Sequence, residues 1–460
     1  MINRVLLLVI IASFYILKST FYKGGDVKYL FVSFFITITP FEFNIPLSSA
    51  LYQTPGGTLG NVFFINVPLI LLCILSPLIK DRVPVFQLLK RKWILLILGL
   101  VAISFLNPYN QSKLETCIFL YFFLTNVLLF IVFSSILSKE EIIKGIYDGL
   151  MVLCLLQFLL ALCFPLMHIA GVTKLFRLAA DEWSTRNGTR EGAVGIFVAP
   201  GNLALFVTLA STYFYSCFLT KFKTKTSLLL CIVNAGTVVL TYSRTSYLTY
   251  IFVLFSLYFI FSKRDKNLFS FANFLKFVTV VAGVLVWLIY FSPLSDAFLK
   301  SDADDMFAAR MVHFTMAFYS FKVSPVIGVG LNAHLEYFSR NFSLFKEIPE
   351  IDEFFLNNPI HNIHLIILVE TGIIGFFLWI AFIVSNFRAS LASLSNNKNQ
   401  VLSLTLIGFI LTYVIYGSTG WAPFSPSILP IFLFMVFFTI QYRDQPDFQD
   451  IPFKYTPATI

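Results

Sequence analysis

Long, uninterrupted apolar runs constrain the fold of this chain more than any other feature of its sequence. The runs are about 15–25 residues long and do not alternate with polar residues, which is typical of membrane-spanning helices rather than barrel strands. Only 12% of the 460 residues are charged and 58% are hydrophobic, so the chain cannot cover a core in water. In lipid, every backbone N–H and C=O group needs an internal partner. The sequence therefore predicts an all-α polytopic membrane protein.

Apolar windows predict about 12 or 13 transmembrane helices. The window at 29–45 is the weakest, because Pro40, Glu42 and Pro46 interrupt it. The expected helix cores are 4–17, 29–45, 61–79, 93–106, 117–137, 147–170, 194–220, 227–242, 246–262, 275–292, 361–387, 401–417 and 425–441. We expect five parts: N-terminal transmembrane helices (1–170), helices with Arg-containing loops (171–292), a large loop (293–360), C-terminal helices (361–441) and a tail (442–460).

Lysine and arginine residues gather in alternate loops, which predicts the orientation of the helices. The segments 80–92, 221–226 and 263–276 are rich in Lys and Arg, so we expect them on the cytoplasmic side. The opposite, periplasmic side then receives the segments 171–192, 243–245, 293–360 and 418–424, and the tail returns inside. The side of the N-terminus stays open. The net charge of +9 is a topology signal, and no nucleic-acid-binding motif or partner is indicated.

The segment 293–360 is far longer than the other loops between the predicted helices. A loop of about seventy residues is usually either functional or disordered. Two stretches within it, Met306–Phe321 and Leu331–Phe345, are amphipathic, which favours helices that lie against the membrane surface. We therefore expect a folded periplasmic cap, in which His313 and His334 are exposed to water.

Four polar clusters interrupt the apolar background, and the predicted topology places all of them on the periplasmic side. They are Arg186 with Arg190, Ser243 with Arg244, Arg310 with the stretch up to Asn332, and His361-Asn362 with His364 and Glu370. Charges at membrane depth are costly and tend to mark substrate paths. A guanidinium fork suits a diphosphate, and an imidazole suits proton transfer near neutral pH. The clusters together predict a site that holds a diphosphate and moves a proton.

Each of these residues also has a purely structural interpretation, which the sequence leaves open. The arginines could be solvated or interfacial charges. His361 and His364 could be packed core residues, and Glu370 could make a structural hydrogen bond inside its predicted span. No Cys pair has CxxC spacing, and no Asp-x-Asp pair lies on the predicted cytoplasmic side, so neither a metal nor another cofactor is expected.

The fourth cluster resembles the HN-x-x-L-x-x-L-x-E-x-G-x-x-G signature of the O-antigen ligase/polymerase family, in the stretch His361-Asn362-Ile363-His364-Leu365-Ile366-Ile367-Leu368-Val369-Glu370-Thr371-Gly372-Ile373-Ile374-Gly375. Three further stretches resemble other elements of that family, in the family's order. They are Arg190-x-Gly192 with Pro200-Gly201-Asn202-Leu203-Ala204, then Thr241-Tyr242-Ser243-Arg244-Thr245, then Arg310 with Pro325-x-x-Gly328-x-Gly330.

The resemblance implies a GT-C-like enzyme of a bacterial inner membrane, with its active site facing the periplasm. Such an enzyme would transfer a glycan from an undecaprenyl-diphosphate-linked donor to a sugar hydroxyl, with inversion and no metal. His361 would be the catalytic base. The diphosphate would be held by Arg190 and Arg310, with Arg244 and Arg186, and the supporting residues would be Asn362, His364, Glu370 and Asn332.

The acceptor stays open, and we favour a lipid-linked repeat unit (a polymerase) over lipid A-core (a ligase). The chain departs from the ligase pattern of Arg, three residues, Leu, because it has Arg186 to Arg190 and Arg310 to Phe314. Other polysaccharide-assembly proteins are further possible partners. A transporter or flippase of lipid-linked sugars is the rival class, but it would carry charges through the membrane midplane and show repeat symmetry.

Overall fold

The computed structural model describes residues 2–21, 27–41, 45–46, 59, 64–79, 92–163, 192–197, 199–262, 303–348, 351, 355–356, 358–396 and 398–444. Several predicted features lie outside these residues. They are the span at 275–292, the Lys/Arg-rich segment 263–276 and most of the segment 80–92, Arg186 and Arg190, and the tail from 445.

Apolar helices dominate the described part of the chain, which confirms the all-α polytopic class. Six helices are long and apolar enough to cross a membrane, and every predicted window except 275–292 coincides with an apolar helix. The long helices are α6 (Lys113–Ile136), α7 (Lys139–Cys163), α10 (Pro200–Leu219), α12 (Arg244–Ser262), α18 (Ile363–Ser395) and α19 (Gln400–Gly417). The others are α1 (Ile2–Phe21), α2 (Tyr29–Ile38), α3 (Val67–Leu75), α5 (Lys92–Leu106), α11 (Thr224–Leu240) and α20 (Leu429–Tyr442).

Two short interruptions accompany the helices. Helix α2 ends at Ile38, and the 3-10 turn Thr39–Phe41 follows, because Pro40 cannot donate the next helical hydrogen bond. Within the described residues the only strands are β1 (Ile45–Pro46) and β2 (Phe64–Ile65), which form one antiparallel pair.

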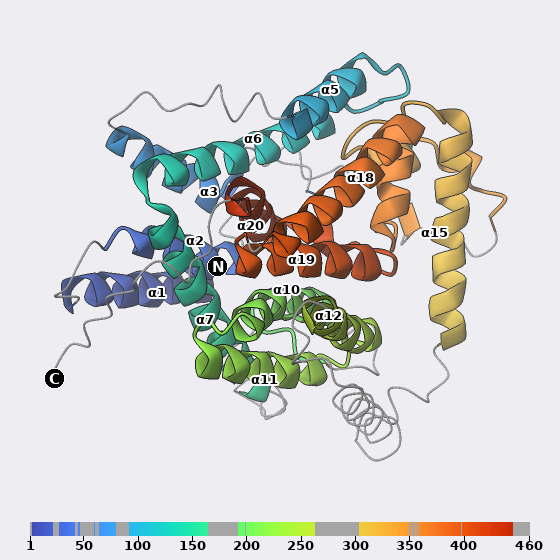
Figure 1. Cartoon of the computed structure of the whole chain (residues 1–460). Coiled ribbons are helices and arrows are strands. Elements are labelled where there is room, and N and C mark those ends of the chain that lie inside the picture. Colours follow the sequence, from blue (N-terminus) through green and yellow to red (C-terminus); the bar gives the residue numbers. More distant parts are fainter. Residues whose placement is uncertain are drawn as a thin grey trace.

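Helices α10 and α19 form the centre of the bundle (Figure 1). They pack against each other and against α12, and α10 is buried along almost its whole length. The hydroxyls of Thr208 and Ser216 donate to carbonyls four residues earlier in α10, so they need no partner outside their own helix. Outer helices expose apolar side chains such as Leu159, Leu229 and Phe252, as expected for helices that face lipid.

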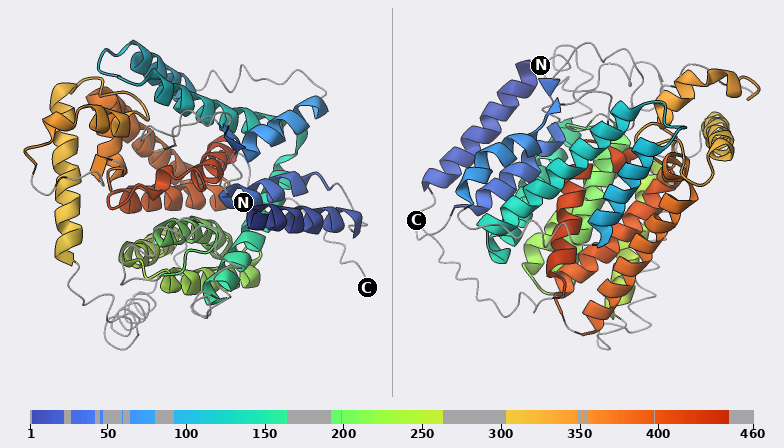
Figure 2. Two further views of the ribbon diagram at one scale, coloured as in Figure 1. Left: turned by 180° about the vertical axis from the view of Figure 1, so that it is seen from behind. Right: turned by 90° about the horizontal axis from the view of Figure 1, so that it is seen from above.

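Residues 303–348, here called the cap, contain helices α15 (Ala303–Val323) and α16 (His334–Arg340), which coincide with the two amphipathic stretches. Seen from above, the bundle helices run in similar directions, while α15 appears nearly end-on at one extremity (Figure 2). Helix α15 therefore lies across the end of the bundle rather than within it. Its inner face buries Met316 and Ala317, and its outer face exposes Phe314 and Phe318. An apolar outer face is typical of a helix at the lipid–water boundary.

Helix α18 is broken at Gly372, where φ is 61° and ψ is −164°. His364 and Trp379 lie on opposite sides of the break, and their side chains are hydrogen-bonded at 3.3 Å. In a straight helix, fifteen residues would separate the two backbone positions by about 22 Å. The break therefore bends the first turns of α18 back toward its long second part.

The loop between α15 and α16 is inserted at this break. The amides of Val329 and Gly330 donate to the carbonyls of Val369 and Glu370, both at 2.9 Å. On the other side of the break, the amides of Ile373 and Ile374 donate to the carbonyls of Pro325 and Val326 at 2.9 and 3.3 Å. These four groups of α18 would have bonded to one another in a continuous helix, so the loop replaces the two lost helical bonds.

The inserted loop comes so close that two positions admit only glycine. A Cβ atom on Gly372 would stand 2.4 Å from the carbonyl carbon of Val326, and one on Gly328 would stand 2.3 Å from that of Glu370. The φ of Gly328 is also positive, at 69°. The glycines in the predicted signature therefore serve this docking of loop on helix, and the docking fixes the cap on the bundle.

Candidate active site

Arg310, His313 and His361 come together where α15 crosses the start of α18. Arg310 and His313 are three residues apart on α15, and His361 lies two residues before α18. The rings of His313 and His361 have centroids 5.5 Å apart and planes tilted by 32°. Arg310 is exposed, and its charge acts on the His361 ring.

The His361 imidazole is held in its neutral form. Burial lowers its pKa from 6.5 to about 4, and the positive charge of Arg310 lowers it further in the same direction. The ring is only partly buried, so it remains reachable from outside the protein. A neutral imidazole beside a guanidinium is an acceptor for a proton and is already next to a group that binds phosphate oxygens.

The prediction that His313 and His334 are exposed to water is wrong. His313 is 2% exposed and His334 is fully buried. The spacing of their neighbours explains the burial, because His313 shares an inner stripe with Met316 and Ala317, and His334 shares one with Tyr337 and Phe338. This i, i+3, i+4 pattern is visible in the sequence and indicates the burial of both histidines.

Burial changes the chemistry of His313. Its pKa falls from 6.5 to about 3, first because the ring is desolvated and then because His361 and His334 would repel a second positive charge. Phe355 packs edge-on against the ring, with centroids 5.2 Å apart. The Asn358 backbone approaches the ring, but within the described residues neither ring nitrogen makes a hydrogen bond of good geometry.

Glu370 has a specific partner in the cap. Its Oε1 accepts a hydrogen bond of 2.7 Å from Nδ1 of His334, and both side chains are buried. The structural hydrogen bond that the sequence left open for Glu370 is therefore present. It joins the span of α18 to α16 at the same level as the loop inserted at Gly372.

Asn362 and His364 shape the start of α18. The Asn362 side chain caps the helix by accepting from the amides of His364 and Leu365, and it donates to the carbonyl of Ser418 at 3.1 Å. The indole of Trp379 donates to Nδ1 of His364, so the ring proton lies on Nε2, which donates to the carbonyl of Val414 at 3.1 Å. Both residues thus hold the backbone that carries His361.

Asn332 joins three parts of the chain. Its φ is 60°, its Oδ1 accepts from the amide of Leu59 at 2.9 Å, and its Nδ2 donates to the carbonyl and carboxylate of Glu115 at 3.3 Å. The side chain is 2% exposed. Asn332 therefore braces the loop from inside, in contacts that occupy its polar atoms.

Arg244 begins α12, at a helix N-terminus that favours anions. The adjoining Ser243 and Ser246 lie beside the hydroxyl of Tyr416, which donates to the carbonyl of Gly201 at 2.8 Å. The end of α19 thus contacts both the Ser243-Arg244 and the Pro200-Gly201-Asn202 stretches, and two residues after Tyr416 the carbonyl of Ser418 accepts from Asn362.

The two remaining arginines, Arg186 and Arg190, lie outside the described residues. Gly192 is the described residue nearest to them in sequence. A Cβ on Gly192 would stand 2.1 Å from the carbonyl oxygen of Thr241, and the amide of Ala193 donates to the carbonyl of Leu240 at 2.8 Å. The stretch that follows Arg190 is therefore packed on the end of α11, just before Arg244.

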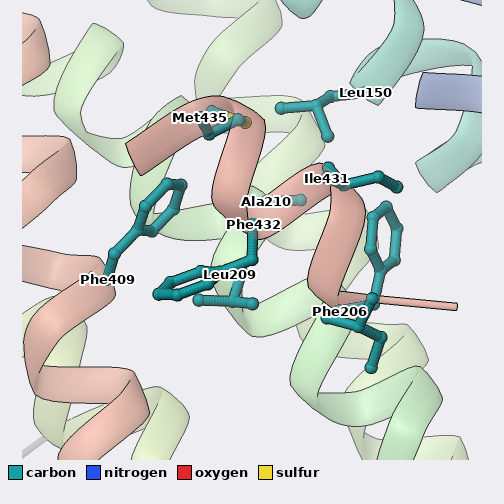
Figure 3. A pocket seen from close by; sticks show the side chains of 9 residues that line it. Leu150, Phe206, Leu209, Ala210, Phe409, Ile431, Phe432 and Met435 are labelled. Atoms are coloured by element: carbon teal, nitrogen blue, oxygen red, sulfur yellow. The ribbon is translucent and has the colours of Figure 1, made fainter. Parts of the chain in front are cut away.

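The cavity in Figure 3 is a different feature from this site. It lies in the bundle core between α7, α10, α19 and α20, and only apolar side chains line it, among them Phe206, Phe409, Phe432 and Met435. It has room for about one water molecule. With no polar group it cannot carry the predicted chemistry. Across the described ranges, no three His, Cys, Asp or Glu side chains are placed to hold a metal ion.

Comparison with known proteins agrees with this part of the chain. Residues 229–380 match a family model described as O-antigen ligase, and the match includes Arg244, Arg310, His361 and Glu370. No curated protein matches the chain. The family model confirms the resemblance seen in the motifs: this polytopic membrane protein contains a domain of the O-antigen ligase family.

Proposed function

We propose that the protein transfers a glycan from undecaprenyl diphosphate to a sugar hydroxyl at the periplasmic face of a bacterial inner membrane. The observation that carries the proposal is the neutral, partly buried imidazole of His361 beside the guanidinium of Arg310. The O-antigen ligase match over 229–380 supports it, because that match includes both residues.

In the proposed reaction, the acceptor hydroxyl attacks the anomeric carbon on the face opposite the diphosphate. The new C–O bond forms as the bond to the diphosphate oxygen breaks, and the diphosphate leaves with the bonding electrons. His361 takes the hydroxyl proton as general base. This step needs the neutral imidazole, which is the form present near pH 7 because the pKa of His361 is lowered to about 4. The inversion of configuration follows from the single displacement.

Arg310 stabilises the leaving diphosphate in this proposal. Its side chain is exposed on α15, so it can reach a headgroup at the membrane surface. A planar guanidinium donates two parallel hydrogen bonds to phosphate oxygens and stabilises the negative charge that develops there, as a metal ion would. Arg244 at the N-terminus of α12, with Arg190 or Arg186, would complete the diphosphate site.

Two acceptors remain compatible with this chemistry. We favour a lipid-linked repeat unit, which makes the protein a surface-polysaccharide polymerase of GT-C-like architecture. The alternative is a ligase that transfers the polymer to lipid A-core, and the family match is compatible with either enzyme. The glycan that accumulates in a deletion strain separates the two: short chains identify a polymerase, and free lipid-linked polymer identifies a ligase.

Purified protein with lipid-linked donor and acceptor tests the reaction itself. We expect His361→Ala to lower turnover at least about 100-fold in a protein that is still folded and inserted. Arg310→Lys should also be damaging, because an ammonium group cannot reproduce the bidentate fork.

His364→Ala is the matched control, since His364 is an imidazole of the same helix start that only braces the backbone. It should lower stability more than turnover. The assay contains EDTA, so loss of wild-type activity in the chelator would contradict the proposed mechanism. Near-normal turnover by His361→Ala would contradict it as well.

A further inference from the structure

A ridge of exposed side chains runs along the outer face of α15. Arg310, Phe314, Phe318 and Lys322 follow one another at intervals of four residues, so they lie on one side of the helix. Phe314 is 51% exposed and Phe318 is 48% exposed, and both cationic residues are exposed as well. Exposed apolar rings that stand together mark a surface that some partner covers. We call these four residues the outer ridge.

The outer ridge continues onto the apolar outer side of α18. Val326, which follows α15 and is 53% exposed, accepts a hydrogen bond of 3.3 Å at its carbonyl from the amide of Ile374. Ile373 and Ile374 are themselves 42% and 39% exposed. They begin an exposed apolar stripe on α18 that continues through Phe377, Ile380 and Val384. One apolar surface therefore runs from α15, across the docking point of the loop, onto a helix of the bundle.

The break at Gly372 marks where α18 leaves this apolar environment. All the exposed large apolar side chains of α18 lie after the break, and the residues before it are buried or half-buried. The helix after the break, 373–395, is about 34 Å long, so it can cross a hydrocarbon layer of about 30 Å by itself. One edge of the hydrocarbon layer therefore lies close to Gly372. Helix α15 crosses the end of the bundle and is docked at Gly372 through the loop at 325–330, so it lies at that edge (Figure 2).

The chemistry of the outer ridge fits a lipid leaflet. Between 310 and 326 the sequence has no Asp or Glu, so the formal charges of this stretch are all positive. The ammonium of Lys322 lies 4.5 Å from the ring centroid of Phe318, so its charge stays close to the apolar surface that its stem covers. Aromatic rings flanked by cations are typical of helices at the level of the headgroups, with the rings toward the acyl chains and the cations beside phosphates. A sugar could stack on the rings, but it would not account for the apolar continuation onto α18.

We propose that the outer ridge is seated in the outer leaflet of the membrane and that this seating holds Arg310 at the level of the phospholipid phosphates. Phe314 and Phe318 contact the upper part of the acyl chains, and Lys322 pairs with a lipid phosphate. The placement of Arg310 rests on the proposed function. A donor whose polyprenyl tail lies in the same leaflet presents its diphosphate at this depth, within reach of Arg310. Phe314 and Phe318 are therefore positioning residues for the site that holds the leaving group.

Tryptophan in place of Phe318 tests the seating, because Phe318→Trp keeps an aromatic ring beside Lys322. The variant is placed in vesicles whose phospholipids carry bromine on the acyl chains, and the fluorescence of the wild type is subtracted to remove the native tryptophans. We expect the added fluorescence to fall about twofold or more, most strongly with bromines about 5–10 Å below the headgroups, which is the depth of an interfacial helix. Acrylamide in the water should quench it only weakly.

Leu344→Trp is the matched control. Leu344 is 46% exposed, close to the 48% of Phe318, but its neighbours Ser343, Lys346 and Glu347 are exposed polar residues. We expect acrylamide to quench this tryptophan and the brominated lipids to leave it unchanged. Bromine quenching no stronger in Phe318→Trp than in Leu344→Trp overturns the seating. Protection of Phe318→Trp from both quenchers overturns it too, because a protein surface then covers the outer ridge.

Replacing both rings by serine tests the positioning of Arg310. Phe314→Ser with Phe318→Ser should leave the unfolding temperature in detergent unchanged, since both rings are exposed. In vesicles we expect kcat/KM for a lipid-linked donor to fall about tenfold, because Arg310 is no longer held at the depth of the diphosphate. With a short-chain, water-soluble donor, whose diphosphate is held at no fixed depth, variant and wild type should turn over alike. Phe314→Leu with Phe318→Leu keeps the apolar contact and should restore kcat/KM, and Leu344→Ser should leave it unchanged.

The outcomes separate this proposal from the proposed function. Near-normal turnover by His361→Ala overturns the function and with it the placement of Arg310, whereas the fluorescence of Phe318→Trp does not depend on activity and tests the seating alone. If the tryptophan is quenched as expected but the double serine variant keeps the wild-type kcat/KM, the positioning of Arg310 is wrong. An equal loss with the short-chain donor shows general damage to the protein, and also overturns the positioning.

Discussion

Buried polar side chains are handled differently in the bundle and in the cap. In α10, Thr208 and Ser216 donate to carbonyls of their own helix at 2.7 and 2.6 Å. In the cap and the loop that docks it, Asn107 donates to the carbonyl of Gly328, and Ser104 accepts from the amide of Leu331. The two hydroxyls of α10 are satisfied within one turn of their own helix, while the loop that docks the cap is held by partners more than 200 residues away in sequence.

This difference separates two kinds of stability. Hydroxyls bonded within a helix can be lost singly, because the helix keeps its backbone ladder. Long-range bonds in the cap hold a loop that has no ladder of its own, so the loss of one leaves a buried partner unsatisfied. We expect mutations in the cap to be more costly than equally buried changes in the bundle.

The largest effect is expected at the docking point of the loop. Gly372→Ala should cost about 3 kcal/mol or more of the free energy of unfolding, because the glycine-only backbone conformation and the contact with Val326 both exclude a Cβ. Gly99→Ala in α5 is the control, since a Cβ there meets nothing within 4 Å. Denaturant or thermal unfolding in detergent measures both variants. Similar stability of the two would show that the break in α18 does not depend on glycine.

Acid should weaken the cap through His313. Its folded pKa, about 3, lies below the unfolded value of 6.5, so the unfolded chain binds more protons between these values. The free energy of unfolding therefore decreases as the pH is lowered from 6.5 to 3. At pH 5 the free energy of unfolding is about 2 kcal/mol lower than at pH 7.5. The size of this loss is set mainly by the pKa of the unfolded chain, because pH 5 lies well above the folded pKa. His313→Phe should lose less stability over this range, as measured by unfolding at the two pH values. An equal loss in wild type and variant would mean that His313 is not the group responsible.

The smallest effect compares two buried serines directly. Ser104→Ala should cost about 1–2 kcal/mol, because the buried amide of Leu331 loses the oxygen that it reaches at 2.7 Å. Ser216→Ala should change stability by less than about 0.5 kcal/mol, since the carbonyl of Thr212 keeps its place in the helix. Both side chains are buried, so exposure does not separate them. Equal costs would remove the distinction between bundle and cap.

Much of the fold was predictable from local pattern. Apolar windows located the helices because a span must bury its own backbone bonds in lipid, which needs no knowledge of distant residues. The same windows missed the break in α18, since apolar residues on both sides of Glu370-Thr371-Gly372 make one continuous window. The break depends on the loop at 325–330, whose hydrogen bonds replace the lost helical ones.

The candidate site was predicted in part. The motif around His361 indicated a base, and α15 carries Arg310 at the same end of the bundle. Asn332, Asn362 and His364 proved to be braces and caps, because their polar atoms are bonded to backbone groups or to other side chains of the protein. His313 and His334 were placed in water although their neighbours follow a buried stripe.

The sequence by itself determined that the chain lies in a membrane, where its apolar helices are, that the cap contains amphipathic helices, and which family it resembles. Each of these conclusions depends on composition or on residues close together in the chain. Only the tertiary structure decided which ionisable groups are buried and which face one another. The pKa of His361 is lowered first by burial and then by Arg310, fifty-one positions earlier, and the partner of Glu370 is His334 on another helix. Burial and charge act through space, so the chemistry of an imidazole follows from what surrounds it rather than from its neighbours in the chain.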